Sequence, residues 1–129
     1  MELVRDHTQC EVIVTGNLFG DLLSDLCAQL IGGMGIAPSA NLNADNGKGL
    51  FGPVNGSAPN LAGRGVVNPL GAILSAAMML SQLGFDAEAG VIEEAVVAVV
   101  RARECTRDIG GELSTAEAGD AVEKHLKGS

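Results

Sequence analysis

The sequence has almost no aromatic side chains: its 129 residues include no Trp, no Tyr and only three Phe. Aromatic rings are the usual surfaces on which nucleic-acid bases and sugars stack, so their scarcity argues against a binding site of that kind. The interior must instead be formed by Ala, Val, Leu, Ile and Met. The composition therefore predicts an aliphatic core.

Positive charge is also scarce, because 8 Lys and Arg residues stand against 16 Asp and Glu and give a formal net charge of −8. This balance argues against nucleic acid or an anionic membrane as a partner. Long hydrophobic runs are absent, and the longest nearly apolar stretch, residues 72–80, is far too short to span a bilayer. A chain of this length is expected to form one compact unit over residues 1–129.

Cysteine is rare, and the three residues Cys10, Cys27 and Cys105 are an odd number without the paired spacing of a metal site. No charged segment followed by an apolar run opens the chain. Both observations favour a reducing, cytoplasmic location. We expect all three cysteines to be small core residues.

Glycine, by contrast, is abundant: the 18 glycines amount to about twice the usual ~7% and cluster between positions 32 and 71. The β-branched run at residues 11–15 predicts a buried strand, and leucines at helical spacing predict a helix over residues 18–31. The glycine-rich region that follows is expected to hold loops and two short extended pieces, at residues 40–42 and 49–51.

The remainder of the chain predicts helices. Asn68 and Pro69 provide an N-cap and first-turn proline for a helix to about Leu83, apolar on nearly all sides. Asp86 is expected to cap the next helix, which ends near Arg103. Residues 114–117 fit a capping box for the last helix. The chain is thus expected to be α/β, with few short strands and about four helices.

Two other residue types receive simple interpretations from their surroundings in the sequence. Met78 and Met79 are expected in the core. His7 and His125 lie in polar surroundings near the two ends of the chain, and we expect both to be exposed and without a function.

Asp21 and Asp25 are the candidate catalytic and metal-binding residues. At a spacing of four residues both carboxylates lie on one helical face, where like charges repel by roughly 0.2–0.5 kcal/mol unless a cation lies between them. Mg²⁺ or Mn²⁺ is the expected ion, because hard cations prefer oxygen ligands. Two other interpretations remain open: a solvated helix face, or a pair that shares a proton and acts as acid or base.

Several segments together resemble one enzyme family, the isocitrate and isopropylmalate dehydrogenases, which are β-decarboxylating 2-hydroxyacid dehydrogenases. Residues 12–25 resemble the family's metal-site segment. The segments that resemble its cofactor loop, the helix after that loop and its last helix follow in the same order: Gly56-Ser57-Ala58-Pro59, Ala62-Gly63, Asn68-Pro69, Ile73 to Leu80 and Ser114 to Val122.

The resemblance implies a truncated isopropylmalate-dehydrogenase-like α/β fold that corresponds to the C-terminal third of the family and is completed by oligomerisation. Residues 1–46 resemble the end of the small, dimer-forming domain, and residues 47–129 resemble the C-terminal segment of the large nucleotide-binding domain. The family's substrate-binding arginines, its proton-transferring lysine and tyrosine, and its third metal-binding aspartate belong to segments that this sequence does not match. Strands near residues 12–15 and 50–54 would then have unpaired edges, so we expect a homodimer or higher oligomer joined through the helix at residues 18–31.

The resemblance also implies a set of cofactor-facing residues, as relics or weak contacts: Asn55, Gly56, Ser57, Ala58, Asn60 and Asn68. Three positions differ from the pattern of relatives. Asn60 replaces an aspartate that accepts hydrogen bonds from the ribose in NAD-dependent relatives, Asn55 replaces a histidine, and Gly52 replaces a glutamate. A neutral amide forms a weaker bond than a carboxylate at such a position. The pattern predicts a retained fold with relaxed dinucleotide binding.

Two functional hypotheses follow. The first is a small non-redox enzyme that uses Asp21 and Asp25 on a small or medium-sized organic substrate and requires no cofactor, with Mg²⁺ or Mn²⁺ as an option. The second is a split-enzyme or accessory chain that needs an N-terminal partner and uses NAD only in that complex, or a non-catalytic binding protein. Independent NAD-dependent oxidation is not expected, because most of the groups that position the substrate are missing.

Overall fold

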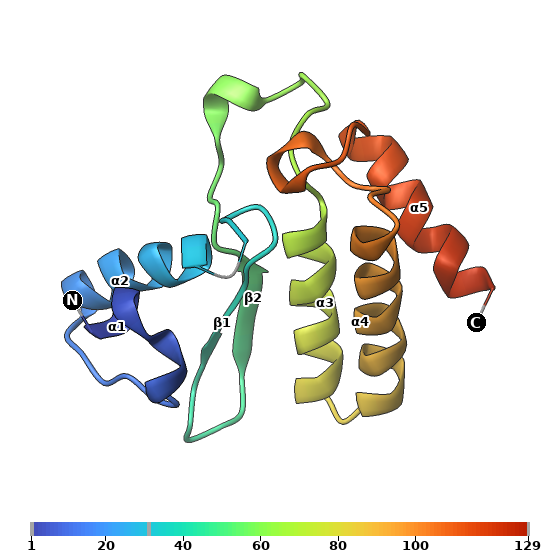
Figure 1. Cartoon of the computed structure of the whole chain (residues 1–129). Helices are drawn as coiled ribbons and strands as arrows, with labels where there is room; N and C mark the ends of the chain where they lie inside the picture. Colours follow the sequence, from blue (N-terminus) through green and yellow to red (C-terminus); the bar gives the residue numbers. More distant parts are fainter. Residues whose placement is uncertain (1, 31, 129) are drawn as a thin grey trace.

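The computed structural model describes residues 2–30 and 32–128 and has the predicted α/β architecture. Two N-terminal helices lie on one side of a β-hairpin, and three further helices lie on the other (Figure 1). The elements, in order, are α1 Glu2–Arg5, α2 Asn17–Leu30, β1 Pro38–Leu42, β2 Gly49–Pro53, α3 Leu70–Gln82, α4 Asp86–Arg101 and α5 Thr115–Lys127. Short 3-10 turns cover His7–Gln9, Pro59–Leu61 and Arg107–Ile109.

The core lies where α3, α4 and α5 pack together. Leu70 from α3, Val96 and Val99 from α4, and Val122 from α5 are buried there, with Cys105 from the loop between α4 and α5. Leu70 and Val99 are completely inaccessible to solvent. The core is aliphatic, as the composition predicts.

The hairpin places β1 and β2 antiparallel, with Ala40 opposite Phe51 and Pro38 opposite Pro53. The turn is held by Asn43, whose amide donates to the Lys48 carbonyl at 2.8 Å and whose side chain accepts from the Asp45 amide at 2.9 Å. Both strands also contact α3. The hairpin is the only sheet among the described residues, so its two outer edges have no neighbouring strand there.

Local signals predicted most element boundaries correctly. The helix expected over residues 18–31 is α2, although Ile31 lies outside the described residues. The start of α3 lies one residue later than predicted: Pro69 occupies the N-cap position, and Asn68, the residue before it, accepts a hydrogen bond from the Leu70 amide at 2.9 Å. The capping box at the start of α5 is confirmed: the Ser114 amide donates to the Glu117 carboxylate at 2.8 Å, and the Glu117 amide donates back to the Ser114 hydroxyl at 3.4 Å.

The ends of α4 differ from the prediction. Asp86 is the first helical residue and not the cap; its carboxylate accepts a hydrogen bond from the Ser81 hydroxyl at 2.5 Å. Arg101 is in the last turn, whereas Arg103 lies beyond the helix with a φ of 58°. The side chain of Asp86 therefore joins the ends of α3 and α4.

The buried strand predicted over residues 11–15 is wrong. The segment is irregular, and Val12 and Val14 are 83% and 93% exposed. A strand needs a neighbour to satisfy its backbone hydrogen bonds, and none of the described residues offers one. Residues 11–15 have the β-branched composition of a strand, but no described strand lies beside them to pair with.

Several predictions of burial are also wrong, each for a non-local reason. Cys10 is exposed and Cys27 is half-buried, so only Cys105 is a core cysteine. Met79 is 40% exposed because it lies in an open depression between α3 and β2, which Phe51 and Pro53 also line. His125 is half-buried, with its Nε2 3.4 Å from a Glu104 carboxylate oxygen.

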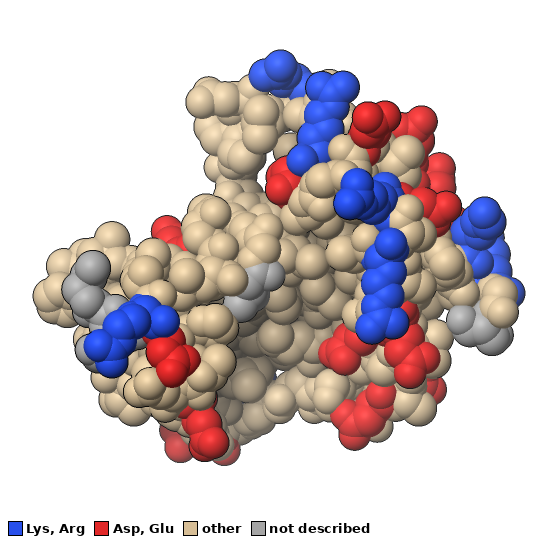
Figure 2. Space-filling view, in the orientation of Figure 1, with Lys and Arg blue, Asp and Glu red and all other residues tan. Residues whose placement is uncertain are grey.

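One side of α3, here called the α3 outer face, is both apolar and exposed. It consists of Ala72, Ala76, Met79 and Leu83, which recur at helical spacing. No residue of α3 carries a charge. Figure 2 shows Lys and Arg gathered over the end of α4 and the loops near it, while the centre of the visible face, over the hairpin and α3, is almost without charge. None of the helices in the described ranges has the length and hydropathy needed to cross a bilayer.

Candidate functional site

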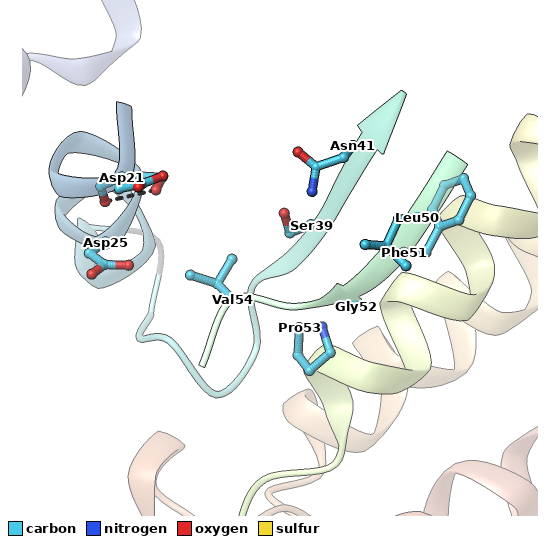
Figure 3. A pocket seen from close by; sticks show the side chains of 10 residues that line it. Asp21, Asp25, Ser39, Asn41, Leu50, Phe51, Gly52, Pro53 and Val54 are labelled. Atoms are coloured by element: carbon cyan, nitrogen blue, oxygen red, sulfur yellow. Dashed lines mark hydrogen bonds between the residues drawn. The ribbon is translucent and has the colours of Figure 1, made fainter. Parts of the chain in front are cut away.

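Asp21 and Asp25 lie one turn apart on α2, as the sequence predicts. Both side chains are exposed and are on the side of the helix that faces the hairpin (Figure 3). Ser24, between them, donates its hydroxyl to the carbonyl oxygen of Asp21 at 3.0 Å. That bond keeps the serine hydroxyl on the backbone of α2.

A depression of about 520 Å³, here called the carboxylate pocket, separates α2 from the hairpin. Asp21 and Asp25 form one wall, and Ser39 and Asn41 of β1 supply a hydroxyl and an amide at the opposite wall (Figure 3). The remaining lining comes from Ser24 and from residues 50–54. The pocket thus combines two carboxylates with neutral hydrogen-bonding groups and an apolar surface.

The carboxylate pocket was only partly predictable from the sequence. Ser39 and Asn41 were not singled out, although their spacing of two residues places both on one face of β1. Their proximity to α2 depends on how the hairpin packs, which is a property of the tertiary structure. A polar pair at alternate positions of a short strand was the available signal.

The pair of aspartates fits a hard divalent cation as a partial ligand set. Carboxylate oxygens are preferred ligands of Mg²⁺ and Mn²⁺, and Mg²⁺ commonly keeps several waters beside one or two carboxylates. Within residues 2–30 and 32–128, no group of three His, Cys, Asp or Glu side chains is placed to hold a metal ion. Further ligands would come from water, from a substrate or from another protein segment.

All the candidate cofactor residues except Asn68 lie on a loop over residues 54–67, which begins at the edge of the carboxylate pocket. Its first residue, Val54, lines the pocket and donates its amide to the Ala37 carbonyl at 3.1 Å. Gly56, Ser57 and Asn60 are exposed, whereas Asn55 and Ala58 are half-buried. The structure thus brings the start of this loop next to the pocket that contains the aspartates.

The backbone of the 54–67 loop has four left-handed positions, at Gly56, Ala58, Gly63 and Gly65. Gly56 has a φ of 61°, which costs glycine little, but Ala58 has a φ of 39°, which is rare for a residue with a Cβ. Strained backbone of this kind occurs often at ligand-binding loops. Ala58 directly precedes the 3-10 turn at Pro59–Leu61.

Asn68, the last of the candidate cofactor residues, has a different setting. It is 5% exposed, and its side-chain oxygen and nitrogen are hydrogen bonded to Leu70 and Asp108. Its polar side-chain atoms are therefore already paired within the protein. The side chain serves the fold, and the prediction that Asn68 faces a cofactor stays a prediction.

The family model described as isocitrate/isopropylmalate dehydrogenase matches residues 1–122, which include the paired aspartates on α2 and the loop beside them. The chain belongs to this family. It is 52% identical over 123 residues to a 3-isopropylmalate dehydrogenase from Zymomonas mobilis, covering 95% of this chain and 35% of that protein. It is 46% identical over 127 residues to a homoisocitrate dehydrogenase from Methanocaldococcus jannaschii, covering 98% of this chain and 36% of that one.

Solved structures agree with this assignment. The crystal structure of isocitrate dehydrogenase from Methylococcus capsulatus superposes with a TM-score of 0.91 and 40% sequence identity, over 98% of this chain and 38% of that one. The chain spans little more than a third of the length of the relatives that it matches. The predicted family and α/β fold are confirmed.

Proposed function

We propose that this chain supplies one part of a β-decarboxylating dehydrogenase site: Asp21 and Asp25 hold a divalent cation, and the 54–67 loop receives part of a nicotinamide dinucleotide. The site works only when protein corresponding to the rest of the family fold covers the chain, whether that protein is part of the same polypeptide or a separate one. The observation that carries this proposal is the amount of uncovered surface.

The accessible surface is 8770 Å² for a mass of 13.1 kDa. A folded monomer of that mass typically exposes only about 6,400 Å². The excess, roughly 2,400 Å², resembles the ~1,000–2,500 Å² that one partner contributes to a permanent interface. Several exposed apolar side chains lie on the elements that form the carboxylate pocket: Leu18, Phe19, Leu22 and Leu26 on α2 and Leu50 on β2.

The chemistry of the carboxylate pocket agrees with a positioning role. When bound, a divalent cation supplies Lewis-acid polarisation of a hydroxyl or carbonyl oxygen. Asp21 and Asp25 would bind that cation, and Ser39 and Asn41 would orient polar groups of a substrate in the same depression. The anion-binding and proton-transferring groups would come from the covering protein.

Exposed apolar side chains also support self-association of the chain through α2. Leu18 and Leu22 on this helix are 69% and 62% exposed, although apolar side chains at helical spacing normally face a core or a partner. A second copy of the chain, packed on this stripe, would cover them. This interface would lie beside the aspartates and would leave the hairpin free for the rest of the fold.

A second candidate function, a small non-redox enzyme, has one observation in its favour. The carboxylate pocket is formed by this chain alone, between α2 and the hairpin. A carboxylate pair in such a depression can transfer protons to or from a small organic molecule without any dinucleotide.

One experiment separates the two candidates. The chain is assayed for 3-isopropylmalate-dependent NAD and NADP reduction with Mn²⁺, alone and mixed with the remaining two thirds of the Zymomonas mobilis relative. We expect turnover only in the mixture and its loss in Asp21→Asn and Asp25→Asn, while Asp120→Asn, an exposed carboxylate on α5, serves as the unaffected control. Comparable turnover by the chain alone, or none in a complex that forms, would refute the main proposal.

A further inference from the structure

Three segments that are distant in the sequence meet at the carboxylate of Asp108. The side-chain amide of Asn68 donates to one of its oxygens at 2.9 Å, and the Thr106 hydroxyl donates to the other at 2.5 Å. Asn68 and Thr106 are 5% and 0% exposed. We call Gly35, Asn68, Thr106 and Asp108 the Asp108 cluster.

Gly35 brings the segment after α2 into this cluster. A Cβ atom at Gly35 would lie 2.5 Å from the Asp108 carboxylate and 2.9 Å from the Asn68 Cβ, so only glycine fits there. The Gly35 carbonyl also accepts a hydrogen bond from the Gly71 amide of α3 at 3.0 Å. The chain leaving the aspartate-bearing helix is therefore in direct contact with Asn68 and Asp108.

The same cluster holds the end of the 54–67 loop. Val67 directly precedes Asn68, and its carbonyl accepts a hydrogen bond from the Thr115 hydroxyl at 2.5 Å. The Thr115 amide donates to the Gly65 carbonyl at 2.9 Å. The loop is thus attached at its far end by Asn68 and Thr115, and at its near end by the bond between Val54 and Ala37.

We propose that Asp108 is a positioning residue: by holding Asn68 against the Gly35 segment, it fixes the 54–67 loop relative to the helix that carries Asp21 and Asp25. A dinucleotide on the loop and a cation on the helix then fall within one site. The assignment of these two ligands rests on the proposed function; the positioning of the loop does not.

The geometry permits an exchange of the two side chains as a test. In Asp108→Asn an NH2 group replaces one carboxylate oxygen, so either the Asn68 amide or the Thr106 hydroxyl loses its acceptor, and in Asn68→Asp two carboxylates face each other. In the double variant Asn68→Asp/Asp108→Asn, the new amide donates to the new carboxylate, while the acceptors for Leu70 and Thr106 are kept. The double variant should therefore restore what each single variant loses.

Two measurements decide the proposal. Amide hydrogen exchange of the full chain should show faster exchange over residues 65–70 in both single variants and a return toward the wild-type rate in the double variant. In the mixture with the complementary two thirds of the relative, we expect NAD or NADP to bind about tenfold more weakly to each single variant. Mn²⁺ binding should stay unchanged, because Asp21 and Asp25 are retained.

The outcomes distinguish this inference from the proposed function. Unchanged exchange over residues 65–70 in both single variants would overturn the positioning role, whether or not the mixture is active. Altered exchange in an inactive mixture would uphold the positioning role and refute the proposed function. Equal losses of dinucleotide and Mn²⁺ binding would show a general loss of folding and would also overturn it.

Discussion

The carbonyl oxygen of Gly35 accepts a hydrogen bond from the amide of Gly71 at 3.0 Å, so the segment after α2 touches the first turn of α3 backbone to backbone. A Cβ atom on Gly71 would lie 2.8 Å from that oxygen and 3.3 Å from the Cβ of Pro53. This contact joins the segment that follows α2 to the helical core. It is possible only because Gly71 has no side chain.

Gly71→Ala should therefore destabilise the protein. We expect a loss of about 1–3 kcal/mol in the free energy of unfolding, because backbone must move to admit the methyl group. Gly90→Ala is the matched control: Gly90 lies within α4 with nothing within 4 Å of its added Cβ. That change should stabilise the protein by about 0.5–1 kcal/mol, as alanine favours a helix over glycine. Urea unfolding measures both, and equal effects would contradict the packing described.

Leu22→Lys should disrupt self-association through α2. Leu22 is 62% exposed, and a charge in a covered apolar interface would be costly to desolvate. Sedimentation velocity at micromolar concentration should find dimers or larger species for the wild type and monomers for Leu22→Lys. Val97→Lys, at a residue of α4 that is 47% exposed, should leave the wild-type state unchanged. A monomeric wild type would refute the interface.

The three cysteines should differ in reactivity. Burial, followed by the nearby Asp108 carboxylate, raises the pKa of the Cys105 thiol, and its side chain is inaccessible. Because the thiolate is the reactive form, Cys105 should react with Ellman's reagent only on unfolding. Cys10 is exposed and should react first, with the half-buried Cys27 slower. Rapid labelling of Cys105 in native protein, identified by mass spectrometry, would contradict the core packing.

The start of α5 should be sensitive to acid. Hydrogen bonds from the Ser114 amide and hydroxyl lower the pKa of Glu117 below its ordinary value. The resulting stabilisation is complete above the unfolded pKa, near pH 4.3, and is lost as the pH falls through the lower folded value. Wild type should therefore be more stable than Glu117→Gln at pH 7 and equal to it near pH 2. A constant difference across this range would contradict the assignment.

The sequence predicted those parts of the fold whose determinants are local. The leucine spacing of α2 and the capping box at Ser114 act within one helix and its ends. The strand expected at residues 11–15 and the burial of Met79 depended on neighbours that the described chain does not provide, and local patterns carry no information about them. Only the family resemblance indicated that strands near residues 12–15 and 50–54 would have unpaired edges.

The candidate site likewise has a part that local sequence predicts and a part that depends on tertiary packing. Asp21 and Asp25 were found because their spacing places them on one face of one helix. Ser39 and Asn41, across the carboxylate pocket, come together with them only when the hairpin packs beside α2. The Asp108 cluster was missed altogether, since the bond between Asn68 and Asp108 spans 40 residues of sequence.

The α3 outer face also has a consequence for the lifetime of the chain in a cell. Ala72, Ala76, Met79 and Leu83 form a patch of the kind that chaperones and quality-control proteases recognise on unassembled proteins. Under the proposed function, protein that covers this face should lengthen the lifetime of the chain. Co-expression with the complementary part of the fold should raise its abundance without any change in its synthesis.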